Sequence, residues 1–169
     1  MVADNGVKAL EVLMSEEVSV VVSDVMMPEM NGFDLCRKIK SDIVLSHLPV
    51  MLLTALSDDK QQMYGAASGA DAYIQKPFNI EVVKLRIIKL LEDRARLREA
   101  YARDASSPAV SVKEEKAESM DDLFMNRFLK LIEESYADPD FSIEKGSEKL
   151  GLSRVHLYRK VKELAGVTP

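Results

Sequence analysis

Three polar side chains in the first half of this chain each follow a short apolar run. Asp24 follows the valine-rich run that starts at Val18, Thr54 ends a second run, and Lys76 follows a third. Continuous apolar runs of this length are typical of strands buried in a parallel sheet. The carboxyl ends of such strands meet at one edge, where ligands bind in open α/β folds. An aspartate, a hydroxyl and an ammonium group that meet there are suited to holding a phosphoryl group. Asp24 alone would fit a helix-capping role equally well, so the interpretation depends on all three.

This set of residues resembles the receiver domain of two-component response regulators, from about Ala3 to about Glu92. The resemblance implies a flavodoxin-like fold, which is a doubly wound parallel sheet, and a cis peptide bond between Lys76 and Pro77. The positions that match the family's phospho-acceptor, switch hydroxyl, phosphoryl-binding ammonium and aromatic switch are Asp24, Thr54, Lys76 and Tyr73.

The resemblance implies only part of the family's Mg²⁺ site. Met26 falls where the family offers a backbone carbonyl to the ion, and Asp24 supplies one carboxylate. The acidic pair that ends the family's first strand has no counterpart, because no acidic residue before Asp24 follows an apolar strand. We therefore expect a truncated, partial receiver in which Mg²⁺ binding is weak or absent, since the ion requires near-octahedral oxygen coordination.

The composition describes an ordinary globular chain of 169 residues with 47% hydrophobic residues and a net charge of −5. No apolar run approaches the roughly 20 residues of a membrane span, and no signal peptide is recognisable. The single cysteine, Cys36, excludes an internal disulfide and favours a cytoplasmic location without membrane contact. Two histidines and one cysteine do not suffice for a zinc cluster. The net charge argues against a broadly basic nucleic-acid binder but leaves room for a local basic helix.

Composition and periodicity divide the chain into a receiver (residues 1–92), a helical extension with a linker (93–119) and a small all-α unit (120–169). In the first segment, predicted strands alternate with predicted helices, which is typical of a parallel sheet. The strands are predicted at 18–23, 50–55 and 70–75. The helices are predicted at 6–17, 31–41, 58–68 and from Asn79 onward.

The second unit has the pattern of a helix-turn-helix. Asp121-Asp122, Ser142 and Ser153 are predicted to cap its helices, and Gly151 is predicted to turn the chain between the two short ones. Basic side chains alternate with apolar ones in the last helix, which for an isolated helix indicates no more than a solvated face. Placed after a capped turn, the helix is predicted to contact DNA through Ser153, Arg154, His156, Arg159, Lys160 and Lys162.

Residues 121–169 resemble about half of the DNA-binding domain of AraC/XylS transcription factors, namely its first helix-turn-helix. The matching segments are Phe141–Glu144, Leu150–Arg154, His156–Lys160 and Gly166–Pro169. Gly146 departs from the family pattern, and a glycine inside a helix costs about 1 kcal/mol relative to alanine, which predicts a weak helix. A receiver followed by an AraC-type module resembles the carboxyl end of hybrid two-component proteins. In these proteins a sensor and a histidine kinase precede the receiver.

These resemblances imply phosphorelay signalling in which phosphorylation of Asp24 controls dimerisation and DNA binding. The implied partners are a histidine kinase domain as phosphoryl donor, DNA through residues 142–165, and a second copy of the chain. One alternative is a receiver-like dimerisation scaffold that is never phosphorylated, and another is an inactive fragment of a longer hybrid protein. An aspartate-nucleophile phosphatase would require a second aspartate where Met26 stands. No ATP site or phospho-accepting histidine region is recognisable, so we do not predict an enzyme.

Overall fold

The computed structural model describes residues 1–55, 68–104, 119–136, 138 and 141–166. The chain forms two compact units, Met1–Ala95 and Arg96–Pro169. Most of the helix predicted at 58–68, the linker and the last three residues lie outside the described residues. Among the helices that are described, none has the length and apolar character needed to cross a membrane.

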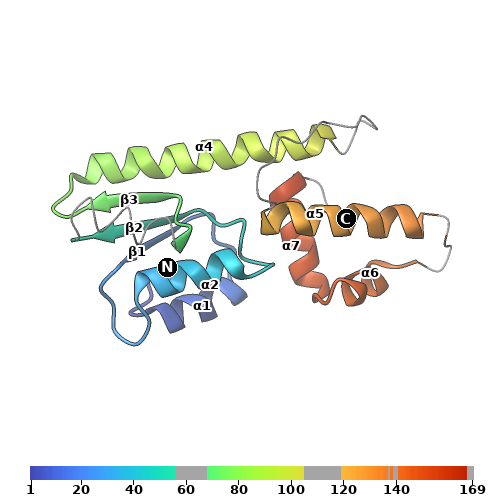
Figure 1. Cartoon of the computed structure of the whole chain (residues 1–169), viewed down its shortest axis with the longest axis horizontal. Helices are drawn as coiled ribbons and strands as arrows, with labels where there is room; N and C mark the ends of the chain where they lie inside the picture. Colours follow the sequence, from blue (N-terminus) through green and yellow to red (C-terminus); the bar gives the residue numbers. More distant parts are fainter. Residues whose placement is uncertain (56–67, 105–118, 137, 139–140, 167–169) are drawn as a thin grey trace. The chain divides into compact units, whose positions relative to one another are not determined.

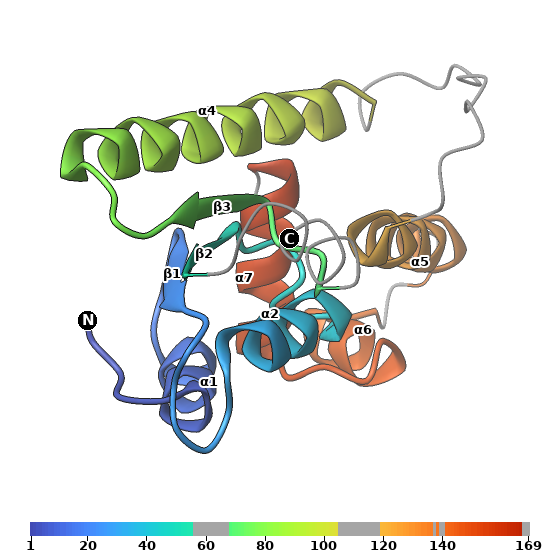
Figure 2. The ribbon, with the colours of Figure 1, turned by 60° about the vertical axis from the view of Figure 1, so that its left-hand side comes forward.

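The described strands of the first unit form a parallel sheet flanked by helices on both faces (Figures 1 and 2). The strands lie in the order β1 (Val21–Asp24), β2 (Val50–Thr54) and β3 (Ala72–Gln75). Two helices cover one face, α1 (Gly6–Ser15) and α2 (Gly32–Ser41), and the first turns of α4 (Ile80–Asp104) cover the other. The parallel α/β architecture predicted for this segment is confirmed.

Side chains that alternate along the strands pack against the helices on both faces of the sheet. Met51 of β2 and Ile74 of β3 pack against Val83 and Leu90 of α4. Successive side chains of a strand point to opposite faces, so Leu52 lies on the side of α1 and α2 and is fully buried. Each such side chain contributes about 1.5–3 kcal/mol when it is removed from water.

The first predicted strand is shorter and more exposed than the sequence indicated. It begins at Val21 instead of Val18, and Val22 is 41% exposed, although the continuous apolar run predicts a buried strand. The reason is topological, since β1 lies at one edge of the described sheet and pairs only with β2 among the described strands. A run of valines reports hydrophobicity, and it does not report how many neighbours a strand has.

The second unit consists of helices. It contains the end of α4 together with α5 (Met120–Ser135), α6 (Ile143–Lys149) and α7 (Arg154–Ala165). Ser142 and Ser153 cap α6 and α7 as predicted. The cap of α5 is Ser119, which forms a capping box with Asp122, whereas we had expected Asp121 and Asp122 themselves to cap this helix.

The core of the second unit is formed by α5 and α7. Phe124, Leu157 and Val161 are completely buried. Gly146, which the sequence analysis treats as a weak point of α6, packs beneath a ring: a Cβ atom at this position would lie 3.1 Å from Cζ of Phe141. The glycine therefore provides room for an aromatic side chain, and the packing offsets part of its low helix propensity.

Candidate phosphoryl-binding site

The register of the sheet brings three strand ends to one edge. Asp24 is in register with Leu53, and Thr54 is in register with Gln75. The residues that end or follow the three strands therefore lie side by side at the carboxyl edge, as the sequence pattern predicted. The backbone hydrogen bonds between β2 and β3 continue one step beyond the strands, since the backbone amide of Lys76 donates to the carbonyl of Thr54 at 2.7 Å.

Asp24 and Lys76 form an ion pair at this edge. The ammonium Nζ of Lys76 contacts Oδ2 of Asp24, and the backbone amide of Met26 donates to Oδ1 at 3.1 Å. The Asp24 side chain is 36% exposed and that of Lys76 39%, so reagents in solution can reach both. The Lys76-Pro77 bond is cis, in agreement with the resemblance.

The electrostatic surroundings favour the ionised form of Asp24. Burial by itself raises the pKa of this carboxyl group, but the hydrogen bond from Lys76, the amide of Met26 and the charge of Lys76 outweigh it. The net effect is a pKa below the ordinary value of 3.8. Asp24 is therefore a carboxylate at neutral pH, which is the form that can act as a nucleophile.

Thr54 and Tyr73 differ in how they are placed. Thr54 is completely buried at the end of β2. Tyr73 lies on β3, and its hydroxyl is 2.6 Å from the hydroxyl of Ser68. Burial is the main cause that raises the pKa of Tyr73, and the bond to Ser68 partly opposes it. The family resemblance predicts that these two residues are the switch positions, but the sequence gave no indication of the contact with Ser68.

The loop after β1 contains a close backbone approach that the sequence analysis did not identify. Gly32, the first residue of α2, donates its amide to the carbonyl of Val25 at 3.0 Å. A Cβ atom on Gly32 would lie only 2.3 Å from the carbonyl oxygen of Asp24. The Asn31-Gly32 dipeptide was a usable signal, because Asn31 caps α2 and the glycine lets the helix begin against the strand end.

A buried asparagine supports the same loop from α1. Asn5 caps this helix by accepting from the amide of Lys8 at 2.9 Å, and its side-chain amide donates to Oε1 of Glu29, also at 2.9 Å. Glu29 has a backbone φ of 62°, a conformation that costs a non-glycine residue about 1 kcal/mol or more. The bond from Asn5 therefore connects the start of α1 to the side chain of this residue.

The residues around Asp24 supply only part of the oxygen ligands that Mg²⁺ requires. No group of three or more histidine, cysteine, aspartate or glutamate side chains in the described part of the chain is placed to hold a metal ion. The candidate donors are the carboxylate of Asp24, which already contacts Lys76, and the backbone carbonyl of Met26. Mg²⁺ prefers six oxygens in octahedral geometry, so these residues alone do not fit a tight site.

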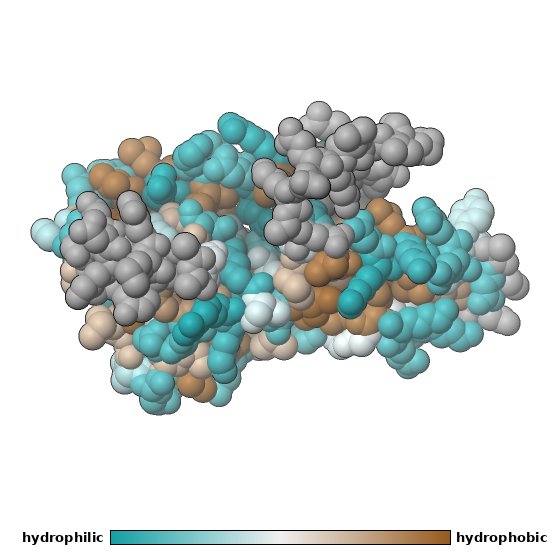
Figure 3. Space-filling view, viewed as in Figure 1, coloured by the Kyte–Doolittle hydropathy of each residue, from teal (hydrophilic) through white to brown (hydrophobic). Residues whose placement is uncertain are grey.

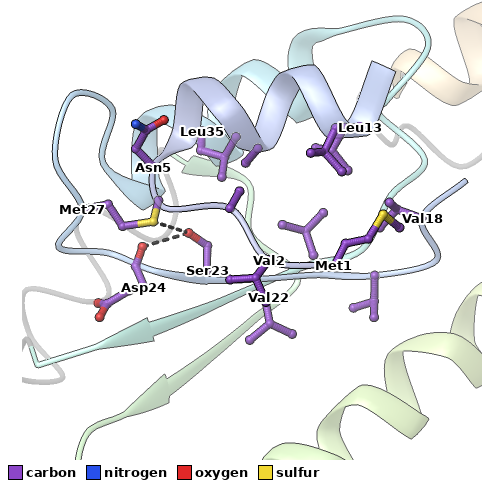
Figure 4. A pocket seen from close by; sticks show the side chains of 15 residues that line it. Met1, Val2, Asn5, Leu13, Val18, Val22, Ser23, Asp24, Met27 and Leu35 are labelled. Atoms are coloured by element: carbon purple, nitrogen blue, oxygen red, sulfur yellow. Dashed lines mark hydrogen bonds between the residues drawn. The ribbon is translucent and has the colours of Figure 1, made fainter. Parts of the chain in front are cut away.

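An apolar pocket of about 350 Å³ runs along the outer side of β1 (Figure 4). Asp24 and Ser23 lie at one end, and Val18 and Leu13 lie at the other. The exposed Val22 forms part of its wall. The edge of the sheet that carries Asp24 and this groove are therefore continuous.

One residue predicted to contact DNA is placed in the core of the second unit. Lys160 is completely buried, and its ammonium lies 2.7 Å from Oδ1 of Asp121 and 5.8 Å from the centre of the Phe124 ring. The expectation that Lys160 contacts DNA is therefore corrected. A buried ammonium requires a partner of opposite charge, and Asp121 of α5 provides it.

The other predicted DNA contacts remain accessible. Ser153, Arg154 and Lys162 are exposed, and His156 and Arg159 are partly exposed. Arg154 forms an ion pair with Glu144 of α6 at 2.8 Å. Val155 and Tyr158, two of the large side chains that alternate with the basic residues of this helix, are also exposed.

Comparison with known proteins identifies the first unit. Residues 1–88, about half of the chain, match the response regulator receiver domain family. The chain is 40% identical over 90 residues to the chemotaxis protein CheY of Pseudomonas aeruginosa, and this match covers 53% of the chain and 73% of CheY. It is also 40% identical over 167 residues to histidine kinase P4 of Formosa agariphila, a match that covers 99% of the chain but only 12% of P4.

Solved structures of receiver domains have the same fold as the first unit. The receiver domain of the Francisella response regulator 1452 is 31% identical and matches with a TM-score of 0.51, over 55% of this chain and 75% of that domain. The receiver of sensor histidine kinase PA1611 from Pseudomonas aeruginosa, which holds a magnesium ion in its active site cleft, shares the fold at 17% identity and a TM-score of 0.50, over 54% of this chain and 75% of its own. Receivers of this family take phosphoryl groups from histidine kinases in two-component signalling. Through residues 1–88, this chain belongs to the response regulator receiver domain family.

Proposed function

We propose that Asp24 is the phospho-acceptor of this receiver. A carboxylate oxygen of Asp24 attacks the phosphorus of a phosphohistidine, a P–O bond forms, and the P–N bond breaks. The imidazole leaves with the electron pair, and the product is an acyl phosphate on Asp24. The observation that carries the proposal is the accessible Asp24–Lys76 pair at the carboxyl edge of the sheet.

We propose that four groups serve this reaction. The ammonium of Lys76 can move from the carboxylate to the incoming phosphoryl oxygens, which carry about −1.5 to −2 charge once the group is attached. The amide of Met26 donates to the carboxylate and orients it. Thr54, buried beside the site, is proposed as the hydroxyl that responds to the phosphoryl group, and Tyr73 as the aromatic side chain that follows it.

The phosphoryl-acceptor role is tested by labelling the whole chain with acetyl phosphate or a phosphorylated histidine kinase domain. We expect a label that is stable in acid, released by hydroxylamine, and absent from Asp24→Asn. Asp34→Asn is the matched control, since Asp34 is an exposed aspartate in α2 that pairs with Arg37. A label that persists in Asp24→Asn overturns the role of Asp24. No label on any residue would favour the scaffold alternative, which the incomplete Mg²⁺ donor set supports.

We infer that the second unit is a DNA-binding module similar to the first helix-turn-helix of AraC/XylS proteins. The support is the surface of α7, where Arg154, Val155, Tyr158 and Lys162 are exposed next to the partly exposed Arg159. An arginine can read a guanine edge, an apolar side chain can contact a thymine methyl group, and lysine neutralises a phosphate. The alignment with histidine kinase P4 also continues through this unit, which supports an origin in a hybrid two-component protein.

DNA binding is tested by fluorescence anisotropy with a duplex selected from a random pool. Lys162→Ala is expected to weaken binding to all duplexes and to reduce the slope of log K against log salt by about 1. Arg159→Ala is expected to cost about 1–3 kcal/mol and to relax selectivity at one base pair. Lys130→Ala, an exposed lysine on α5, is the control that should change neither. Equal losses for Lys130 and Lys162 would show that the binding is a general charge effect.

A hydrophobic patch on α4 supports the proposed dimer. Ile80, Val82 and Leu85 are each more than half exposed, and Figure 3 shows brown side chains at the amino-terminal end of this helix. Receivers often dimerise, and a dimer would place two DNA-binding modules on two half-sites. Leu85→Glu is expected to abolish dimers in analytical ultracentrifugation, while Lys84→Glu, which changes the neighbouring exposed position, should leave them intact.

A further inference from the structure

Tyr73 lies on the sheet face that carries Thr54, but its hydroxyl bonds to a residue that precedes its strand. In the parallel pairing of β2 and β3, Tyr73 is in register with Leu52, two residues before Thr54 on the same strand. Residues two apart on a strand share a face, so Tyr73 and Thr54 both lie on the side of α2. The hydroxyl of Tyr73 is 2.6 Å from Oγ of Ser68, a short separation for two neutral hydroxyls.

Ser68 is held by contacts on more than one side. It is 3% exposed, and its carbonyl accepts a hydrogen bond from Sγ of Cys36 in α2 at 3.2 Å. The next residue, Gly69, has a φ of 71° and turns the chain toward β3. The hydroxyl of Ser68 is therefore presented to Tyr73 from a buried and fixed backbone.

We propose that Ser68 is a positioning residue for the switch: its hydroxyl holds Tyr73 in the observed side-chain pose and opposes the turning of the ring that accompanies phosphorylation. This inference deepens the proposed function, because it rests on the proposed role of Tyr73. Turning the ring breaks this partly buried hydrogen bond, and the net free energy of such a bond corresponds to a factor of about five in an equilibrium constant. Ser68 therefore adds to the free energy that the phosphoryl group must supply before the ring of Tyr73 turns.

The neutral state of the phenol is compatible with this role. Burial raises the pKa of Tyr73, so the phenol keeps its proton at neutral pH and either hydroxyl can donate. The bond therefore does not depend on pH in the physiological range. Its strength depends on the fixed position of Ser68.

The proposal is tested by NMR on the whole chain, with Tyr73 assigned from Tyr73→Phe. Three-bond couplings report the χ1 rotamer of Tyr73 without any ligand. We expect one rotamer in the native chain and averaging between rotamers in Ser68→Ala. With Mg²⁺ and beryllofluoride, a mimic of the phosphoryl group, we expect about fivefold tighter binding by Ser68→Ala than by the native chain. An unchanged χ1 distribution in Ser68→Ala overturns the proposal.

Two further variants separate this role from a general effect on folding. Tyr73→Phe removes the same hydrogen bond from the other side, so Ser68→Ala added to Tyr73→Phe should cause no further change in beryllofluoride affinity. Ser147→Ala removes another buried serine hydroxyl, in the second unit, and should leave Tyr73 unchanged. If beryllofluoride fails to bind the native chain, the proposed role of Asp24 is in question, but the χ1 measurement on the ligand-free chain still decides the role of Ser68.

Discussion

At the scale of single residues, the ion pair between Asp24 and Lys76 is the feature on which the proposed phosphoryl transfer depends. An isolated aspartate at a strand end has no charged partner. In Asp24, by contrast, the ammonium of Lys76 contacts one carboxylate oxygen and the backbone amide of Met26 donates to the other. The groups that lower the pKa of Asp24 would also stabilise the negative charge of an attached phosphoryl group. The proposed acceptor site is therefore partly assembled before any phosphoryl donor binds.

Replacement of Lys76 by methionine is expected to raise the pKa of Asp24. The pair is more than a third exposed, so solvent screening limits its contribution to about 1 kcal/mol or less. Because the folded pKa is depressed, this contribution is present above the ordinary pKa of 3.8 and is lost as the pH falls through the folded value. Lys76→Met should therefore lose stability at neutral pH and match the native chain in strong acid.

The measurement is a ¹³C titration of the Asp24 carboxyl group combined with denaturant unfolding at several pH values. Lys40→Met is the control, because Lys40 forms a comparable pair with Asp71 at 2.7 Å. It should leave the Asp24 titration unchanged. A pKa of Asp24 that does not move in Lys76→Met would show that the backbone amides alone depress it.

At the scale of elements, the start of α2 fixes the position of the end of β1. Gly32→Ala would place a Cβ atom 2.3 Å from the carbonyl of Asp24, and the contact is with backbone, which cannot turn away. We expect a loss of about 1–3 kcal/mol in the free energy of unfolding and a slower labelling of Asp24. In Gly146→Ala the new atom meets side-chain atoms, Cζ of Phe141 at 3.1 Å and Cδ2 of Leu131 at 3.5 Å, so a smaller change is expected in the same unfolding assay.

The pair of Asp121 and Lys160 fixes α5 against α7. Removing one member of a buried ion pair leaves an uncompensated charge and costs about 3–5 kcal/mol. We therefore expect Asp121→Ala and Lys160→Met each to be strongly destabilising in urea unfolding, and the double variant Asp121→Leu with Lys160→Met to recover most of the loss. Lys130→Met, at an exposed pair 3.9 Å from Glu134, should cost less than about 1 kcal/mol. Additive losses in the double variant would contradict direct coupling.

Local sequence signals predicted the strands, most helices and the edge on which the site lies. Apolar runs and capping residues act within a few positions, so Asp24, Thr54 and Lys76 could be assigned to strand ends. The burial of Lys160 could not be predicted in this way, since its partner Asp121 is 39 residues away and basic residues on a helix usually face solvent. The contact of Ser68 with Tyr73 was missed because side-chain pose depends on packing, which periodicity does not report.

At the scale of the whole molecule, the two units have separate cores. The first is built on Met51, Ile74 and Val83, and the second on Phe124 and Leu157. A unit with its own buried core is able to unfold by itself. The two units are therefore expected to have separate stabilities, which hydrogen exchange by mass spectrometry can measure in the intact chain.

In this experiment, Gly32→Ala is expected to lower protection in residues 21–54 and to leave residues 120–165 unchanged. Asp121→Ala is expected to do the reverse, because the lost ion pair joins α5 to α7 only. A variant that lowers protection in both ranges would show that the units unfold as one body. Separate responses would mean that a phosphoryl group on Asp24 cannot act on α7 by stabilising the receiver alone. Its effect would then have to pass through dimerisation, as the exposed apolar residues of α4 suggest.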